Sequence, residues 1–360
     1  MTLDIFCDII DNYGDIGVVY RLSNELSKKG YNVRIFSNKF GEIQKIIKNF
    51  SADKNFQKLN YIEFINLDEP LKISYTANII IESFGCNIPD EYIDKLDEKT
   101  KLIINLEYLS AESWVEDFHL KESFSPKPFI KKYFYMPSFT LNSGGIILDN
   151  EYLKKVNSIK KDKEYIFNSF YKNLGLKYNS EIFYINIFTY NWNFKNFLTY
   201  LIETNKKYCI FILDNRFDEK IILNDRISIN YLSYMPQEDF DTWLNISDFN
   251  FVRGEESFVR ATLSEIPFIW NIYPQENDIH FDKLSAFIKE LQRFGISDNY
   301  LKLSTSFNKN IDFNAEFYNF KFNNFEKESF SAFKSHLIKN CNLVEKLHYF
   351  INNTINQEEN

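Results

Sequence analysis

The sequence predicts an α/β protein with two Rossmann-like domains facing a central cleft, and three observations lead to this prediction. With 360 residues, the chain is long enough for two domains with separate cores. Short apolar runs alternate with helical patterns in each half, as in a doubly wound parallel sheet. A stretch rich in Lys, Asn and Tyr around residues 150–175 separates the two series.

The domain boundaries follow from this alternation. We expect an N-terminal domain over residues 1–155, an interdomain connection over 156–178 and a C-terminal domain over 179–339. Apolar residues between 326 and 352 recur at helical spacing. Because a long C-terminal helix can cross back to the first domain, we assign residues from about 340 to 360 to the N-terminal domain.

The expected strands are short apolar runs bounded by polar loops. The first run begins at Leu3, and the helix after it carries Val19, Leu22 and Leu26 at helical spacing before Gly30 ends it. In the first half we expect strands at 3–10, 32–37, 61–67, 77–82, 101–106 and 133–136. In the second half we expect strands at 181–188, 208–213, 249–252 and 267–270, with helices at 194–202 and 239–244.

Composition narrows the class of protein. The chain has a net charge of −8 and a pI of about 5.3, which disfavours binding along a nucleic acid backbone and is compatible with a basic protein partner. Its four cysteines lie far apart without a CxxC spacing, as expected of reduced thiols. No signal peptide pattern and no run near 18 apolar residues occurs, so we expect a cytoplasmic protein that does not enter a membrane.

The loop after the first strand, DNYGDIG at 11–17, is the first candidate site. It lacks the GxGxxG pattern of dinucleotide-binding proteins, because its glycines are only Gly14 and Gly17. It offers instead two carboxylates, Asp11 and Asp15, beside glycines that allow close approach of a ligand. Acidic side chains at this sheet edge would suit a cationic acceptor. The alternative is that Asp15 only caps the following helix.

The second candidate site is the stretch 249–281, which indicates a strand, a tight turn at Arg253 and Gly254, a helix and a second strand. The N–H groups and dipole of a helix N-terminus attract anions, and the Ser257 hydroxyl can add a donor. We expect Arg260 to pair with Glu256 rather than with a phosphate. The second strand ends in a polar cluster, whose members are Tyr273, Gln275, Glu276, Asn277, Asp278 and His280.

Other features of the second half have two interpretations. Phe188 and Tyr190 follow the first strand of this half, where aromatic rings either belong to the core or stack on a nucleobase. His280 is expected to be a structural hydrogen-bonding group, since no HxxH or HExxH pattern accompanies it. No metal site is expected, because neither Asp214 with Asn215 nor residues 276–278 supply a full ligand set.

Four long motifs resemble one family. DNYGDIG at 11–17, INLEYLSAESWVEDF at 104–118, FVRGEESFVRA at 251–261 and IYPQENDIH at 272–280 are similar to the bacterial protein-arginine rhamnosyltransferases that modify elongation factor P, known as EarP. The resemblance covers nearly the whole chain. It implies a glycosyltransferase of the GT-B fold that transfers L-rhamnose from dTDP-β-L-rhamnose to one arginine of elongation factor P, with inversion, without a cofactor and without a required metal.

The resemblance also implies roles for single residues. Asp15 corresponds to the general base, Asp11 to a residue that orients the acceptor guanidinium, and Glu276 to a residue that serves the donor sugar or its leaving group. Phe188 and Tyr190 correspond to an aromatic pair near the dTDP moiety. The remaining substrate-binding residues expected from the matched motifs are Asn12, Tyr13, Gly14, Gly17, Phe251, Arg253, Gly254, Glu256, Ser257, Gln275 and Asn277. The chain departs from the family pattern at Asn277, where an acid is expected, and at Glu256, where Asp is common.

Two alternative functions remain at this stage. One is a GT-B transferase with a glycan or lipid acceptor, which a basic amphipathic stretch in the first domain would favour, and the sequence has no such stretch. The other is a regulator that binds a nucleotide sugar without catalysis.

Overall fold

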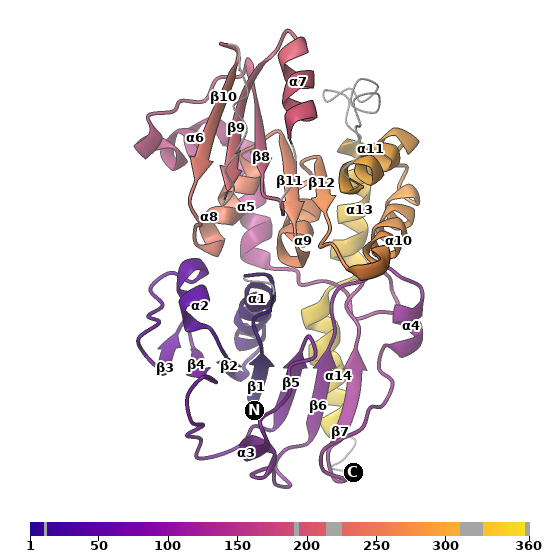
Figure 1. Cartoon of the computed structure of the whole chain (residues 1–360). Coiled ribbons are helices and arrows are strands. Elements are labelled where there is room, and N and C mark those ends of the chain that lie inside the picture. The colour runs from indigo at the N-terminus through magenta and orange to yellow at the C-terminus, as the bar shows by residue number, and fades with distance from the viewer. Residues whose placement is uncertain (11–12, 191–193, 214–224, 310–326, 357–360) are drawn as a thin grey trace. The chain divides into compact units, whose positions relative to one another are not determined.

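The computed structural model describes residues 1–10, 13–190, 194–213, 225–309 and 327–356, which form two compact units (Figure 1). The first unit combines Met1–Asp149 with His336–Asn360, and the second is Asn150–Ser335. Each unit has a largely parallel sheet with helices, so the α/β class predicted from the sequence is confirmed. Asp11 and Asn12 lie outside the described residues.

The first unit is built on a seven-stranded sheet of order β3-β4-β2-β1-β5-β6-β7. Every pair in it is parallel except β3 with β4. Its strands are β1 (Thr2–Cys7), β2 (Asn32–Ser37), β3 (Phe56–Leu59), β4 (Ile62–Asn66), β5 (Ile79–Ser83), β6 (Leu102–Leu106) and β7 (Lys131–Tyr135). Its helices are α1 (Gly14–Lys28), α2 (Phe40–Ile46), α3 (Asp90–Ile93), α4 (Trp114–Phe118) and α14 (Leu343–Asn356).

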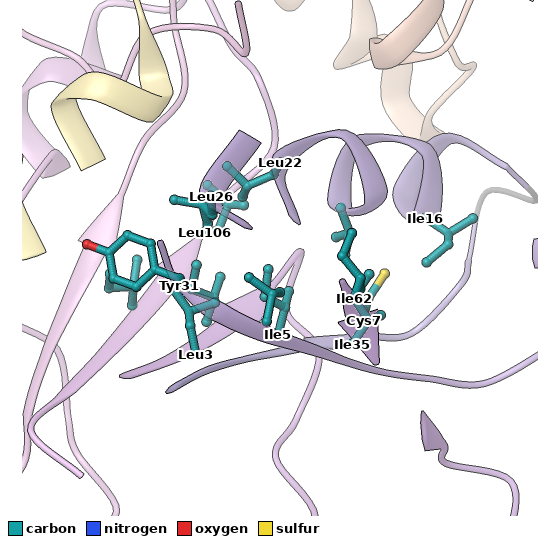
Figure 2. Close-up of a cluster of buried hydrophobic side chains, with 14 of the residues drawn as sticks. Leu3, Ile5, Cys7, Ile16, Leu22, Leu26, Tyr31, Ile35, Ile62 and Leu106 are labelled. Atoms are coloured by element: carbon teal, nitrogen blue, oxygen red, sulfur yellow. The ribbon is translucent and has the colours of Figure 1, made fainter. Parts of the chain in front are cut away.

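The core of this unit follows from the two-residue period of the strands. Leu3, Ile5 and Cys7 of β1 point to one face, where Leu22 and Leu26 of α1 cover them (Figure 2). Phe6 of β1 points to the other face, into a second buried cluster with residues of β2, β5 and β6. Because apolar side chains leave the strand on both faces, the sheet is covered on both, as is usual for parallel sheets.

Asp4 interrupts the apolar run of β1 and is nevertheless completely buried. The Arg34 guanidinium donates to both of its carboxylate oxygens, over 2.7 and 2.6 Å. The Tyr92 hydroxyl donates to the same carboxylate. A buried charge costs much less when it is paired and hydrogen-bonded, which explains how a strand with an internal aspartate remains in the core.

The C-terminal segment forms two helices rather than one. α13 (Lys327–Asn340) ends before Cys341, and α14 begins at Leu343 and packs into the core of the first unit. The Cys341 carbonyl accepts a hydrogen bond from the Ile146 N–H over 2.8 Å. Gly145 has a φ of +79°, and a Cβ there would collide with the Cys341 carbonyl, so this crossing requires glycine.

The second unit has a five-stranded parallel sheet of order β10-β9-β8-β11-β12. Its strands are β8 (Ile182–Ile187), β9 (Lys207–Leu213), β10 (Ile227–Leu232), β11 (Phe249–Arg253) and β12 (Phe268–Asn271). Its helices are α5 (Asn150–Lys161), α6 (Lys163–Phe170), α7 (Lys195–Glu203), α8 (Gln237–Asn245), α9 (Glu255–Ser264), α10 (His280–Gln292), α11 (Asp298–Asn308) and most of α13, with short 3₁₀ turns η1 (Lys172–Leu174) and η2 (Glu276–Asp278).

The segment expected as an interdomain connection, 156–178, is part of the second unit instead. The Tyr171 ring stacks on Phe211 of β9 with ring centres 4.2 Å apart. Lys163 forms an ion pair with Asp248 over 2.6 Å. The expected boundaries near 155 and 339 therefore move to 149 and 335. Burial of aromatic side chains outweighs the polar composition that made the segment resemble a linker.

Both sheets place a topological switch point where the chain reverses its direction of strand addition. In the first unit this point lies between β1 and β5, and in the second it lies between β8 and β11. Ligands of open α/β sheets bind beyond the carboxyl ends of the strands at such points. We therefore expect ligand-binding residues in the loops after β1, β8 and β11.

Candidate active site

Asp15 lies in the first turn of α1, the helix that follows β1 at the switch point of the first unit. Its side chain is buried, with a residue exposure of 4%. One carboxylate oxygen accepts the Ile10 N–H over 2.9 Å and the other accepts the Tyr108 hydroxyl over 3.3 Å. Groups of the chain thus hold both oxygens of the carboxylate, which fixes its orientation.

Asp15 does not occupy the N-cap position of α1. The helix begins at Gly14 and its N-cap is Tyr13, whereas Asp15 lies within the first turn and bonds to the N–H of Ile10. The alternative that Asp15 only caps the helix is therefore wrong. The neighbouring Cys7 thiol has its pKa raised by burial and then by the charge of Asp15, so it stays protonated and contributes no competing anion.

The other residues expected in this loop have different surroundings. The Tyr13 hydroxyl accepts a hydrogen bond from Lys45 over 3.2 Å, and burial raises the pKa of its phenol. Gly14 is the first residue of α1. Gly17 is buried within that helix, and its N–H donates to the Tyr13 carbonyl over 3.0 Å. Tyr13 and Gly14 thus border the Asp15 loop, while Gly17 contributes to helix packing.

In the second unit, Arg253 at the end of β11 is held between two aromatic rings. Its guanidinium carbon lies 4.3 Å from the centre of the Phe188 ring and 5.0 Å from that of Tyr190. It donates to the Thr189 carbonyl over 3.0 Å and to the Tyr234 hydroxyl over 3.1 Å. Stacking and two directed hydrogen bonds fix the plane of the guanidinium, so its charge is positioned before a ligand arrives.

The helix that follows Arg253 begins at a glycine. Gly254 has φ 65° and ψ −173°, a conformation that is essentially restricted to glycine. The Trp270 indole N–H donates to its carbonyl over 3.1 Å and fixes the turn. Because the N-cap residue has no side chain, a bound anion can satisfy N–H groups of the first turn of α9.

Two acids occupy that first turn, and each has a cationic partner. Glu255 lies 3.6 Å from the Lys283 ammonium. Glu256 lies 3.4 Å from the Nε atom of Arg260, whose side chain is fully buried, so the expected ion pair is confirmed. These partners offset the negative charge that would otherwise repel a diphosphate. The Ser257 hydroxyl donates to the Arg253 carbonyl of the preceding turn, so in this structure it supports the helix rather than pointing to an anion.

The loop after β12 carries the remaining expected residues. Gln275 and Asn277 are exposed, and Asn277 has a left-handed φ of 56°. Glu276 begins the 3₁₀ turn η2, and its side chain lies outside the described residues. His280 is buried, and its Nδ1 atom accepts the Gln275 N–H over 3.1 Å. The structural interpretation of His280 is confirmed, because that bond orders the loop that presents Gln275 and Asn277.

Phe251 belongs to the core of the second unit. Its side chain is fully buried and packs against the rings of Phe194, Phe197 and Phe307. Its carbonyl accepts the Phe188 N–H over 2.9 Å. The structure therefore brings Phe188, Tyr190, Arg253 and the start of α9 together, whereas Phe251 supports them from beneath.

Sequence reasoning did not single out two residues of this group. The Asn271 side chain at the end of β12 accepts the Tyr190 N–H over 2.9 Å and fixes the aromatic pair. Tyr234 follows β10, an edge strand that the sequence pattern did not predict. The position of Asn271 directly after a buried strand is a signal that could have identified it; Tyr234 offers no comparable signal.

The described residues of the two units do not include an evident metal centre. Among them, no group of three or more His, Cys, Asp and Glu side chains is arranged to hold a metal ion. In the same part of the chain, no helix is both long and apolar enough to cross a membrane. All four cysteines are buried, and their thiols are reduced.

Comparison with known proteins agrees with this arrangement. The family described as elongation factor P (EF-P) rhamnosyltransferase EarP matches residues 3–352. A "Protein-arginine rhamnosyltransferase" of Shewanella oneidensis is 32% identical over an alignment of 340 residues, and the alignment covers 85% of each chain. A protein of the same name from Pseudomonas putida is 30% identical over an alignment of 316 residues, and this alignment covers 83% of each chain.

Solved structures show the same fold. The structure reported as "Structural basis for EarP-mediated arginine glycosylation of translation elongation factor EF-P" aligns with 98% of this chain and 99% of its own, with a TM-score of 0.64 and 21% identity. The glycosyltransferase VinC in complex with dTDP aligns over 99% of this chain and 100% of its own, with a TM-score of 0.51 and 9% identity.

The chain has two Rossmann-like units with polar residues at their switch points, and it shares its fold with solved glycosyltransferases. These features define a glycosyltransferase of the GT-B fold. The protein is an enzyme of that class. Within the class, the chain belongs to the EF-P rhamnosyltransferase family EarP, which its sequence matches over nearly its whole length.

Proposed function

We propose that this enzyme transfers L-rhamnose from dTDP-β-L-rhamnose to an arginine side chain of elongation factor P, with inversion at the anomeric carbon. The observation that carries the proposal is the buried and oriented Asp15 carboxylate at the switch point of the first unit. Membership of the EarP family supports the choice of acceptor and sugar.

The acceptor sets the chemical problem. A guanidinium has a pKa of about 12.5–13.8, so it is protonated and a poor nucleophile at neutral pH. A carboxylate that accepts a hydrogen bond from one guanidinium nitrogen can hold that nitrogen in place and take its proton as the new bond forms. Asp15 fits this role, because a backbone N–H and a phenol orient its carboxylate in the first turn of α1.

The donor side needs stabilisation of negative charge. As the nitrogen attacks the anomeric carbon, the carbon–oxygen bond to dTDP breaks and its electron pair stays on the diphosphate. Arg253 and the N–H groups at the start of α9 supply fixed positive charge for that group. Direct attack on the face opposite the leaving group inverts the anomeric configuration. The donor charge is thus met by groups of the chain, and we propose that no metal or other cofactor is required.

The test is incubation of the purified chain with dTDP-β-L-rhamnose and unmodified elongation factor P. The intact mass of the acceptor should increase by one deoxyhexose, located on an arginine by fragmentation. Asp15→Asn should lower the turnover by a factor of about 10²–10⁴, the usual contribution of a general base, while dTDP still binds. Asp53→Asn makes the same chemical change at an exposed position and serves as the control.

Three results would contradict the proposal. An unchanged acceptor mass with the wild-type enzyme would exclude this acceptor. Consumption of the donor without change in any protein would favour a glycan or lipid acceptor. Full activity of Asp15→Asn would remove the assigned base.

A further inference from the structure

α4 and the loop before it lie beyond the carboxyl end of β7, on the same sheet edge as Asp15. The Ser110 N–H donates to the Pro137 carbonyl over 3.3 Å, just after β7. The helix ends at Phe118, and the Nδ1 atom of the next residue, His119, accepts the Met136 N–H over 3.2 Å. Figure 1 shows α4 beside β7, the outermost strand of this side of the sheet.

The loop that leads into α4 also reaches Asp15. It leaves β6 at Leu106, and its Tyr108 hydroxyl is the group that donates to the Asp15 carboxylate. The same short segment therefore positions the proposed base and carries α4. A protein that presents a side chain to Asp15 would therefore also contact the loop after β6 and α4.

α4 buries only one of its five residues and exposes large aromatic side chains. Val115 is the buried residue. Trp114 is 43% exposed and Phe118 is 51% exposed, and their rings pack edge to face with centres 6.0 Å apart. Two adjacent exposed aromatic rings on a short helix are unusual on a surface that serves only solvation, and Trp is the residue most enriched at the centres of protein interfaces.

The surroundings of these rings are acidic. Glu116 and Asp117 are exposed on the same helix, and Glu112 precedes it. The side-chain amide of Asn142 donates to Glu116 over 3.5 Å, which places the preceding residue, Leu141, near α4. Leu141 is 62% exposed and enlarges the apolar part of this surface. We define the α4 surface as Glu112, Trp114, Glu116, Asp117, Phe118 and Leu141.

We infer that the α4 surface is where the acceptor protein docks, through a partner face that combines apolar side chains with basic ones. This inference rests on the proposed function. An acceptor whose target is an arginine brings positive charge to this sheet edge, and the three acids of the α4 surface complement it. A second copy of the chain would place acid against acid, which charge repulsion disfavours. Continuity with Asp15 through residues 108–114 selects this surface over exposed aromatic residues elsewhere.

The chain offers a matched control. Phe124 is 99% exposed and belongs to the segment that follows α4. The preceding Ser123 N–H donates to the carbonyl of Lys132 near the start of β7, so Phe124 lies toward the opposite end of that strand. Its removal tests the effect of losing an exposed ring without touching the α4 surface.

The experiment measures binding of the full-length chain to unmodified elongation factor P by calorimetry, and then the steady-state kinetics of transfer. Trp114→Ala and Phe118→Ala should each raise the Kd for the acceptor protein about tenfold or more, as for truncation of an interface anchor. The KM for the acceptor should rise in parallel, with kcat at saturation and affinity for dTDP unchanged. Glu116→Lys should also weaken binding of the acceptor protein, and the loss of affinity should be larger at low salt than at high salt.

The outcomes separate the two proposals. If the wild-type chain binds the acceptor but transfers no sugar, the proposed function is wrong. The docking surface is still tested in that case, because the Kd values of the variants for the acceptor can be compared with that of wild type. If both alanine variants bind like wild type, or Phe124→Ala weakens binding equally, the docking surface is overturned. A change of oligomeric state in the variants, seen by light scattering, would also overturn it in favour of contact between copies of this chain.

Discussion

The Tyr108 hydroxyl donates to the Asp15 carboxylate over 3.3 Å and joins the loop after β6 to the first turn of α1. Ninety-three positions separate the two residues in the sequence. The parallel order β1-β5-β6 brings the carboxyl ends of their strands to one edge. Asp15 is therefore held by groups from two loops, and its orientation does not depend on α1 alone.

Tyr108→Phe should lower kcat about fivefold to tenfold, because one hydrogen bond is worth about 1 kcal/mol and no longer orients Asp15. Affinity for dTDP should not change. Steady-state kinetics with the acceptor protein measures the first, and calorimetry the second. The control is Tyr133→Phe on the outer strand β7, which loses a hydrogen bond to Glu122. A fall in dTDP affinity with unchanged kcat would contradict the assigned role of Tyr108.

Arg253→Lys should weaken binding of dTDP about tenfold, although the charge is kept. A lysine ammonium cannot stack on Phe188 and also reach both the Thr189 carbonyl and the Tyr234 hydroxyl, so its position is no longer fixed. Titration calorimetry with dTDP measures the effect. Arg226→Lys provides the comparison, because Arg226 lies just before β10 and its guanidinium donates to the Asn205 side chain. Equal affinities for wild type and Arg253→Lys would show that the fixed guanidinium plane does not matter.

The free energy of unfolding should fall as the pH decreases from about 6.5 to about 4. Burial, followed by the charge of Lys346, lowers the pKa of His119 to about 4, whereas an unfolded histidine titrates near 6.5. Between these values the unfolded chain binds a proton that the folded chain does not, so stability is present above the window and lost within it. Urea unfolding at several pH values measures this slope.

His119→Gln serves as the comparison for that pH dependence. Glutamine does not titrate, and its side-chain oxygen can accept the Met136 N–H that now bonds to the His119 ring. The variant should show a shallower fall in stability across the same pH range. Identical slopes for the two chains would assign the pH dependence to other groups.

Chelation of divalent ions should leave the transfer rate unchanged. In the proposed mechanism, Arg253 and the start of α9 meet the diphosphate charge, and no step needs a cation. Rates measured with EDTA and with added Mg²⁺ test this. A rate that falls with EDTA and recovers with Mg²⁺ would show that a cation shares the diphosphate charge.

Local sequence patterns correctly predicted the α/β class, the β2 strand at Asn32–Ser37 and the helix after Gly254. These features depend on local periodicity and on backbone angles that one residue type allows. It also led us to predict Arg253 and Asp15 as site residues, because ligands of open α/β sheets bind beyond the carboxyl ends of strands. The ion pair of Glu256 and Arg260 could be predicted for a related reason, because residues four apart lie next to each other on one face of a helix.

Contacts between distant segments, in contrast, determine which of these residues lie side by side. Segment 156–178 looks polar in sequence, yet Tyr171 stacks on Phe211 and makes it part of the second unit. Phe251 and Phe188 look alike in sequence, but one fills the core and the other stacks on Arg253. Such choices depend on contacts between distant strands, and a local pattern carries no information about them. The bond from Tyr108 to Asp15 exists for the same reason: strand order, which the chain reaches only on folding, brings the two loops together.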